Sequence, residues 1–314
     1  MIQKDFHGFL YQYDETEGFR IVSKEGMNPP ATFYKYYALT DYNVEALTNL
    51  YLYAAHPNQL NDPLDCAEEL IKFDNMYVLR HFLEPIYPSV HSLYNGNEEE
   101  ISIFARRAYK TLLYMKWGVL SLSTNCLDIP MWSAYTNHKG FCIELDLSKL
   151  PYNYKTVGPY PVNYLDSLEC ISLNKDSIQL ATIIQTNIKK SCWKHEKEWR
   201  LLLEGHADYY MEPFGYLAAE LKKKFPDYHN RKFKYPLRCL KSVCLGKDFF
   251  NGICSVITDY EKEYVATDKQ KNDILSFLSL TKIPTYLLDT DELEVVRVPI
   301  EIIKIGNDTY RINY

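Results

Sequence analysis

Residues 193–203 of this 314-residue chain read WKHEKEWRLLL, and this segment decides the fold class. It follows a long amphipathic stretch, and the change of pattern predicts a strand over residues 196–203. Alternate residues of a strand share one face, so Glu196, Glu198 and Arg200 are predicted to lie together. They are interpreted as a salt-bridged surface strand or, because like charges side by side are costly, as a ligand site.

Outward from this segment, strand-like and helical patterns mix without the regular alternation of a doubly wound fold. Strands are predicted at residues 32–37, 50–53, 118–123, 141–145 and 241–245, with a C-terminal hairpin at 294–305 and 309–313. Helices are predicted at residues 64–88, 100–116 and 129–138, and Asp41 can cap another that carries Val44, Leu47 and Leu50. Residues 176–194 form a long amphipathic stretch. The sequence therefore predicts the α+β class. It also predicts an N-terminal extension (1–30), a main domain (31–250) and a C-terminal α/β extension packed on it (251–314).

The composition excludes several classes of function. The 12 glycines are never closer than Gly246 and Gly252, which leaves no GxGxxG dinucleotide turn and no Walker A loop. The 8 cysteines form no CxxC pair, and HEKEW at residues 195–199 lacks the second histidine of a zincin helix. We therefore expect no disulfide framework and no metal site. A net charge of −6, without any long apolar run or leader, predicts a cytoplasmic protein with no membrane segment.

Three further features are candidates for binding. The Asn61-Asp62-Pro63 turn is interpreted as a helix N-cap, to which a ligand role can be added. Trp132 and Tyr135 lie three residues apart on a predicted helix and form either a core pair or part of a pocket. Residues 222–241 carry eight basic side chains against one acid, with interleaved aromatic rings, as in a solvated loop or a nucleic-acid contact. The candidate contacts there are Lys223, Arg231, Lys232, Lys234 and Tyr235.

Taken in order, these motifs resemble a large bacterial family catalogued as an uncharacterised domain, over about residues 31–248. The shared features are a tyrosine-rich first strand (Tyr34 to Tyr37), the Asn-Asp-Pro turn, a Met-Trp-Ser-x-Tyr helix that ends at His-x-Gly (Met131 to Gly140) and the Glu-x-Glu-Trp-Arg strand. More distantly, the first strand, Pro130-Met131 and residues 198–202 resemble ADP-ribosyltransferases of the DarT type. In that group a histidine stands where this sequence has Lys35 or Tyr36.

The distant resemblance implies a split, largely antiparallel sheet flanked by helices, and an enzyme that uses NAD as its substrate. Breaking the nicotinamide–ribose bond develops positive charge on the ribose, which a carboxylate stabilises. The resemblance implies Glu198 in this role, and Glu196 as the group that orients or deprotonates the acceptor. The implied NAD-binding residues are Lys35, Tyr36, Asn61, Asp62, Trp132, Tyr135 and Arg200. An aromatic ring would stack on nicotinamide, and Lys35 or Arg200 would hold the pyrophosphate.

We therefore expect an NAD-dependent ADP-ribosyltransferase, a toxin or anti-phage effector that modifies RNA or DNA. Such a toxin is expected to have an antitoxin or chaperone partner. Two alternatives remain open. An NAD glycohydrolase would use water as the acceptor, and a non-enzymatic binding module of a defence or regulatory complex would keep the motifs for structural reasons alone.

Overall fold

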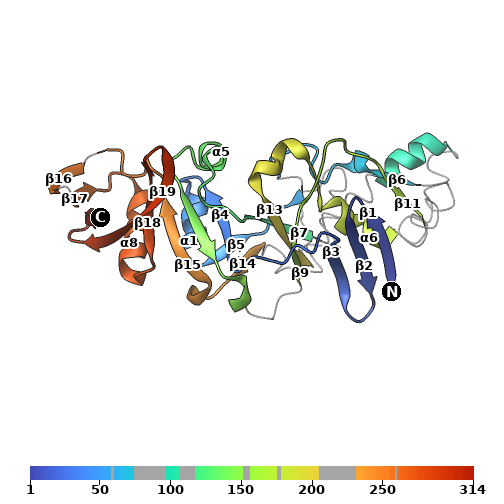
Figure 1. Cartoon of the computed structure of the whole chain (residues 1–314), viewed down its shortest axis with the longest axis horizontal. Helices are drawn as coiled ribbons and strands as arrows, with labels where there is room; N and C mark the ends of the chain where they lie inside the picture. Colours follow the sequence, from blue (N-terminus) through green and yellow to red (C-terminus); the bar gives the residue numbers. More distant parts are fainter. Residues whose placement is uncertain are drawn as a thin grey trace.

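A computed structural model describes the chain except for residues 58–59, 74–96, 107–116, 151–155, 175–177, 205–230, 253 and 259. Its main feature is one eleven-stranded sheet in an elongated molecule, with the two chain ends far apart along the long axis (Figure 1). Neighbouring strands of this sheet are antiparallel, apart from the parallel pair β15 and β18. The prediction of an α+β fold with a mixed, largely antiparallel sheet is confirmed.

The strands of the large sheet are mostly short and rich in β-branched and aromatic residues. In spatial order they are β16 (Cys254–Thr258), β17 (Glu261–Val265), β20 (Thr309–Asn313), β19 (Glu294–Lys304), β18 (Thr285–Asp291), β15 (Leu240–Leu245), β8 (Phe141–Leu145), β4 (Phe33–Tyr37), β7 (Trp117–Ser123), β13 (Glu198–Glu204) and β9 (Thr156–Pro161). Two-stranded pairs are β5 (Tyr51–Tyr53) with β14 (Lys232–Lys234), β6 (Ile71–Phe73) with β11 (Ile171–Leu173), and β10 (Asn163–Leu165) with β12 (Ile188–Lys190).

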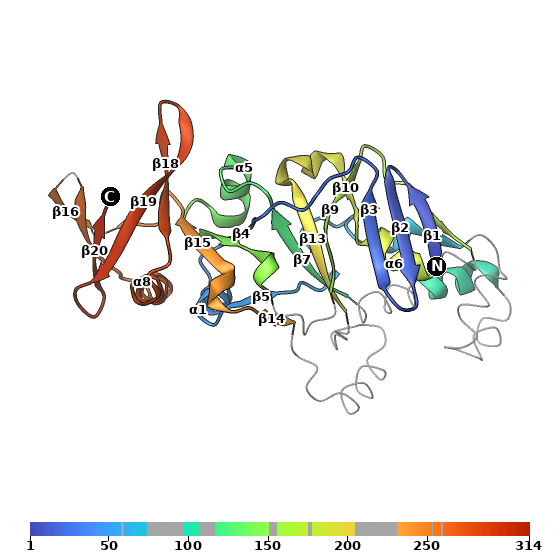
Figure 2. The same cartoon turned by 60° about the horizontal axis from the view of Figure 1, so that its bottom comes forward.

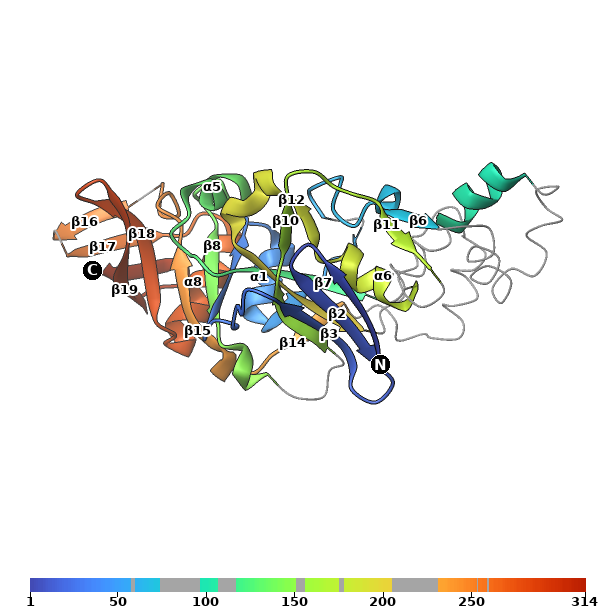
Figure 3. The ribbon, with the colours of Figure 1, turned by 45° about the vertical axis from the view of Figure 1, so that its right-hand side comes forward.

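The first residues of the chain, within the predicted N-terminal extension, form a separate antiparallel sheet. Its strands are β1 (Ile2–Phe6), β2 (Phe9–Asp14) and β3 (Gly18–Ser23). This sheet lies beside β9 and α6 (Ile178–Gln185), and Phe9 and Tyr11 share a core with the apolar residues of that helix (Figure 3). The buried apolar surface explains why the N-terminal strands stay attached to the main sheet.

Helices cover both faces of the large sheet (Figures 1 and 2). Helices α1 (Asp41–Thr48) and α8 (Lys269–Thr281) pack on one face, and α5 (Ile129–Met131) continues as the π-helical turn η3 (Trp132–Thr136) on the other. Short 3₁₀ turns are η2 (Glu68–Leu70), η4 (Leu147–Lys149), η5 (Ser191–Glu196) and η6 (Leu237–Cys239), and residues 98–106 are helical. Among the described residues, no helix combines the length and the apolar character needed to cross a membrane.

The large sheet opens between β4 and β7. These two strands pair only at Tyr34 and Ser123, whereas β4 pairs with β8 over five residues and β7 with β13 over seven. The edge of β7 that the opening exposes is taken up by Ala55, which exchanges two hydrogen bonds of 2.8 Å with Val119. The sheet is therefore split, and a space lined by two strand edges is left at its centre.

One predicted helix differs from the structure. The helix predicted at 64–88 is wrong at its start, because residues 63–66 form a turn that leads into η2 and β6; its remainder lies outside the described residues. Within the amphipathic stretch at 176–194, the helix that forms is α6. The chain after α6 pairs with β10 as β12, so strand pairing ends the helical part of this stretch.

Candidate functional site

The opening between β4 and β7 contains a cavity of about 210 Å³. Side chains reach it from β4, β7, β12 and β13, from η3 and η5, and from the loop after β5. Seven of the nine residues predicted for catalysis and NAD binding line it: Lys35, Tyr36, Asn61, Tyr135, Glu196, Glu198 and Arg200. The fold thus brings together motifs that lie far apart in the sequence.

Strand alternation directs two of these side chains into the cavity. Trp199 packs in the core beneath α1 and α8, so Glu198 and Arg200 face the opposite side of β13. Glu196 is not on the strand but ends η5, because Lys197 adopts a left-handed backbone with φ of 46°. The predicted strand position of Glu196 is therefore wrong, although its side chain lines the same cavity.

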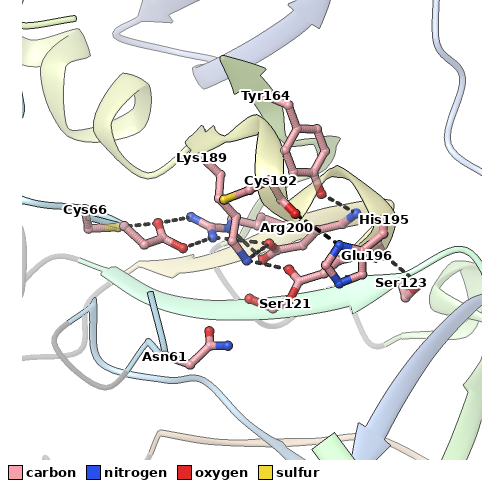
Figure 4. A network of polar contacts seen from close by, with 12 residues as sticks. Asn61, Cys66, Ser121, Ser123, Tyr164, Lys189, Cys192, His195, Glu196 and Arg200 are labelled. Atoms are coloured by element: carbon pink, nitrogen blue, oxygen red, sulfur yellow. Dashed lines mark hydrogen bonds and ion pairs between the residues drawn. The ribbon is translucent and has the colours of Figure 1, made fainter. Parts of the chain in front are cut away.

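A buried lysine joins the two glutamates. Lys189 Nζ donates to Glu196 Oε2 at 2.5 Å and to Glu198 Oε2 at 2.9 Å (Figure 4). The three side chains are only 3–4% exposed. One ammonium group shared by both carboxylates offsets the repulsion between two like charges held this close.

Arg200 has all five of its N–H groups occupied within the protein. Its Nε donates to Glu198 Oε1 at 2.8 Å, and Nη1 donates to Asp65 Oδ1 at 2.8 Å and to the Thr186 carbonyl at 2.7 Å. Its Nη2 donates to Asp65 Oδ2 and, at 3.4 Å, to Glu198 Oε2. A guanidinium group carries five donors, so none is left for a pyrophosphate. Arg200 therefore has no N–H group left to make the predicted contact with the pyrophosphate.

The ion pairs keep the groups of this network charged. Burial raises the pKa of Glu198, but the charges of Arg200 and Lys189 outweigh burial and lower this pKa to about 2. Burial lowers the pKa of Lys189, but Glu198 and Glu196 together outweigh burial and raise this pKa above its usual value. The pKa of Arg200 is raised in the same way, because Asp65 and Glu198 outweigh its burial. Glu198 is therefore a carboxylate throughout the neutral range.

Glu196 is held by groups on three other segments. Tyr135 Oη donates to Glu196 Oε1, and Asn61 Nδ2 donates to Tyr135 Oη at 2.8 Å. Ser123 Oγ donates to the Glu196 carbonyl at 2.8 Å and fixes the end of η5. Burial, followed by the hydrogen bond to Glu196, raises the pKa of Tyr135, so this residue is a neutral phenol. Asn61 and Tyr135 therefore position a carboxylate at the cavity wall.

The opposite wall, on β4, holds a cation with fewer partners. Lys35 is half-buried, and its Nζ donates to the Ser121 carbonyl at 3.1 Å. Burial lowers the pKa of Lys35 to about 8, although the charge of Glu198 acts in the other direction. An ammonium group has three donors, so Lys35 has N–H groups to offer to an anionic ligand.

The two other predicted NAD-binding residues, Trp132 and Asp62, do not line the cavity. Trp132 is fully buried, donates from Nε1 to the Cys126 carbonyl at 2.7 Å and packs edge-to-face on the Tyr36 ring at 5.3 Å. Its core interpretation is the correct one, since it supports Tyr36 from behind. Asp62 accepts a backbone N–H of the following turn at 2.9 Å rather than beginning an α-helix.

The basic stretch is described from residue 231 onward, which leaves Lys223 outside the described residues. Arg231 and Tyr235 are each 4% exposed, so they are not placed to contact a nucleic acid directly, contrary to the prediction. Lys232 forms an ion pair of 2.6 Å with a glutamate of α1, and Lys234 is exposed. Packing against β5 explains this burial, because β14 pairs with that strand.

Sequence reasoning does not identify Lys189 and Asp65 as site residues. Lys189 falls within the amphipathic stretch at 176–194, and Asp65 is interpreted as an acid that favours a helix N-terminus. The segment before Lys189, residues 180–188, reads LATIIQTNI and mixes apolar with polar residues, so no local signal marks this lysine as buried. Within the described part of the chain, no three His, Cys, Asp or Glu side chains gather as a metal ion would require.

The protein thus has an α+β fold with a split sheet. The cavity in the split is lined by carboxylates that form ion pairs with cations of the protein itself. Residues 131–201 match the family model described as a protein of unknown function, DUF2971. This stretch contains Tyr135, Lys189, Glu196, Glu198 and Arg200, whereas Lys35 and Asp65 precede it. No curated protein and no solved structure matches the chain. The family description gives no activity, so a function has to be argued from the cavity.

Proposed function

We propose that the protein is an NAD-dependent ADP-ribosyltransferase with its active site in the cavity between β4 and β7. One observation carries this proposal. The motifs that resemble those of DarT-type enzymes, with Lys35 and Tyr36 on β4 and Glu198 on β13, line the same cavity from opposite walls. A split in an antiparallel sheet, without a glycine-rich turn, is where such a site is expected.

The charges of the cavity suit cleavage of a nicotinamide–ribose bond. The ionised Glu198, whose Oε1 accepts from Arg200, would stabilise positive charge on the ribose. Nicotinamide would leave with the electron pair of the broken bond. The acceptor atom would then bond to the ribose carbon and lose its proton to Glu196. Lys35 is the cation with donors for the pyrophosphate.

The test is NAD turnover by the wild type and by Glu198→Gln, measured as release of nicotinamide. The substitution keeps the shape of the side chain but removes its charge, so we expect turnover to fall by at least a factor of 10², about 2.7 kcal/mol. Glu301→Gln, at an exposed position of β19, is the matched control and should retain full activity. Undiminished turnover in a folded Glu198→Gln protein would refute the assignment.

The acceptor distinguishes two candidate functions. RNA or DNA is the acceptor that the basic stretch predicts, but among the described residues this prediction now depends on Lys232 and Lys234. Burial of Arg231 and Tyr235 favours the second candidate, an NAD glycohydrolase, because water needs no surface beyond the cavity. Radiolabelled NAD incubated with DNA, RNA and cell protein decides between them. Label on a nucleic acid supports the transferase, and free ADP-ribose alone supports the glycohydrolase.

A role as a toxin or anti-phage effector, held in check by an antitoxin or chaperone, extends this proposal. Induced expression of the wild type should stop bacterial growth, and Glu198→Gln should not. Equal growth with both, in cells where the purified wild type is shown to consume NAD, would remove the toxin role.

A further inference from the structure

The cavity is too small to enclose a whole dinucleotide. Its volume of about 210 Å³ is below the roughly 300–1,000 Å³ of pockets that bury a drug-sized ligand. If the reacting nicotinamide–ribose half occupies this space, the adenosine half must lie against a neighbouring surface. Tyr34 marks the direction, because it lines the cavity and also belongs to a second group of side chains on β8, β18 and β19.

This group, which we call the Arg297 shelf, consists of Tyr34, Glu144, Tyr286 and Arg297. The guanidinium carbon of Arg297 lies 4.8 Å from the Tyr286 ring centroid and 5.9 Å from the Tyr34 ring centroid. Its Nη1 is 3.3 Å from Glu144 Oε2, and Ser242 Oγ donates to the same oxygen at 2.6 Å. The shelf therefore combines a guanidinium plane, two phenol rings and a fixed carboxylate.

The shelf and the cavity share one face of the sheet. Tyr34 stands opposite Glu144 in the β4–β8 register, and Glu144 stands opposite Ser242 in the β8–β15 register. Tyr34 also stands opposite Ser123, whose partner on β13 is Glu198. Tyr34 and Glu198 are thus two strands apart, about 10 Å. Arg297 lies a further 5.9 Å from the Tyr34 ring, so an extended dinucleotide can reach both.

The shelf offers the chemistry that recognises a purine. Tyr34 and Tyr286 are half-buried and Arg297 retains 27% exposure of its side chain, so a flat ring can stack there. Aromatic and guanidinium faces attract nucleobases, and a carboxylate accepts from an exocyclic amine. In Figures 1 and 2 the far end of the β18–β19 hairpin lies on the same side of the sheet as α5, which carries the cavity's η3 wall.

We propose that the Arg297 shelf is the subsite for the adenine base of NAD. This assignment rests on the proposed function and gives the C-terminal residues 285–304 a direct part in substrate binding. The reacting half of NAD then occupies the cavity, the pyrophosphate passes Lys35 and Tyr34, and the adenine stacks at Arg297.

The test compares ligands that have and lack adenine. Dissociation constants for NAD, ADP-ribose and nicotinamide mononucleotide are measured by calorimetry on the wild type, Arg297→Met and Tyr286→Leu. Stacking contributes about 1–3 kcal/mol, so each variant should bind NAD and ADP-ribose roughly tenfold more weakly. Nicotinamide mononucleotide, which lacks adenine, should bind the variants and the wild type alike.

Arg311→Met is the matched control, because Arg311 forms a 2.7 Å ion pair with Glu261 at the far end of the same sheet. It should bind all three ligands as the wild type does. If the wild type binds NAD and the shelf variants bind it equally well, the shelf assignment is overturned and the proposed function stands. Equal weakening of NAD and of nicotinamide mononucleotide also overturns it. A wild type that binds none of the three overturns both proposals.

Discussion

The β13 wall of the cavity and the β4 wall opposite it hold their cations in different ways. On the β13 side, Arg200 is fully buried and donates hydrogen bonds from all of its N–H groups to Asp65, Glu198 and a carbonyl. Its pKa is raised. On the β4 side, Lys35 makes one hydrogen bond to a carbonyl, and burial lowers its pKa to about 8. A saturated cation fixes the structure and the charge of its partners, whereas an unsaturated cation is the one that can bind a ligand.

The largest effect is expected when the ion pair between Asp65 and Arg200 on the β13 wall is broken. Asp65→Ala leaves Arg200 buried without its main partner, and breaking such a pair costs about 3–5 kcal/mol of unfolding free energy. The urea midpoint should fall accordingly. Lys232→Met removes an ion pair whose side chains are 40% and 44% exposed, and it should cost less than about 1 kcal/mol. Equal losses of unfolding free energy in Asp65→Ala and Lys232→Met would contradict the expected difference between a buried and an exposed ion pair.

The second prediction concerns the charge that the β13 wall imposes on Glu198. Lys189→Met removes an ammonium 2.9 Å from Glu198 Oε2, so the carboxylate form loses a partner and the pKa of Glu198 should rise by about 1–3 units. In the proposed mechanism the ionised form of Glu198 is the active one, so the acid limb of NAD turnover should move to higher pH. Lys189→Arg keeps the charge and should leave the limb near its original place. An unshifted limb in a folded Lys189→Met protein argues against this role of Lys189.

The third prediction tests Lys35 on the β4 wall, whose N–H groups are proposed to bind the ligand. The lowered pKa of Lys35, about 8, means that this amine loses its charge as the pH rises through 8, and affinity for the NAD pyrophosphate should fall with it. A hydrogen bond to a charged group contributes about 1.5–3 kcal/mol, so Lys35→Met should bind NAD at least tenfold more weakly at pH 7. Lys35→Arg should extend strong binding to pH 10. Calorimetry from pH 6 to pH 10 on the three proteins measures this, and a flat wild-type profile would count against Lys35 as the pyrophosphate contact.

The smallest effect is expected at Tyr135, which connects η3 to Asn61 and Glu196. Tyr135→Phe removes the hydroxyl between Asn61 and Glu196 and leaves the ring in place. Tyr135 acts on the reaction only through the position of Glu196, so we expect a loss of about 1 kcal/mol, and kcat/KM for NAD should fall about fivefold. Tyr42→Phe, at an 81% exposed position on α1, is the control and should change nothing. A complete loss of activity in Tyr135→Phe would instead indicate a direct chemical role for the phenol.

The sequence predicts the elements that bear the site better than the contacts within it. The strands at β4, β7, β8 and β15 follow from short runs of β-branched and aromatic residues, which depend on local pattern alone. The strand β12 lies within the amphipathic stretch at residues 176–194 and is not predicted, because its parallel pairing with β10 is a tertiary contact that no local pattern records.

Within the site, motif residues are predictable and their partners are not. Glu198 and Tyr135 stand in recognisable motifs, and both line the cavity. Lys189 and Asp65 stand in no motif, and they matter only because the fold places them against Glu198 and Arg200. Arg231 shows the same limit in the opposite direction. A basic residue in a basic stretch is expected at the surface, but Arg231 is only 4% exposed.

By itself, the sequence determined the α+β class, the absence of any glycine-rich nucleotide turn and the kinds of side chain available for chemistry. These properties depend on composition and on patterns a few residues long. The tertiary structure alone decided that the sheet splits between β4 and β7 and that Arg200 is saturated while Lys35 is not. It also decided that the C-terminal hairpin contributes Arg297 to the same face as the cavity. These properties arise from contacts between segments far apart in the chain, which local patterns do not encode.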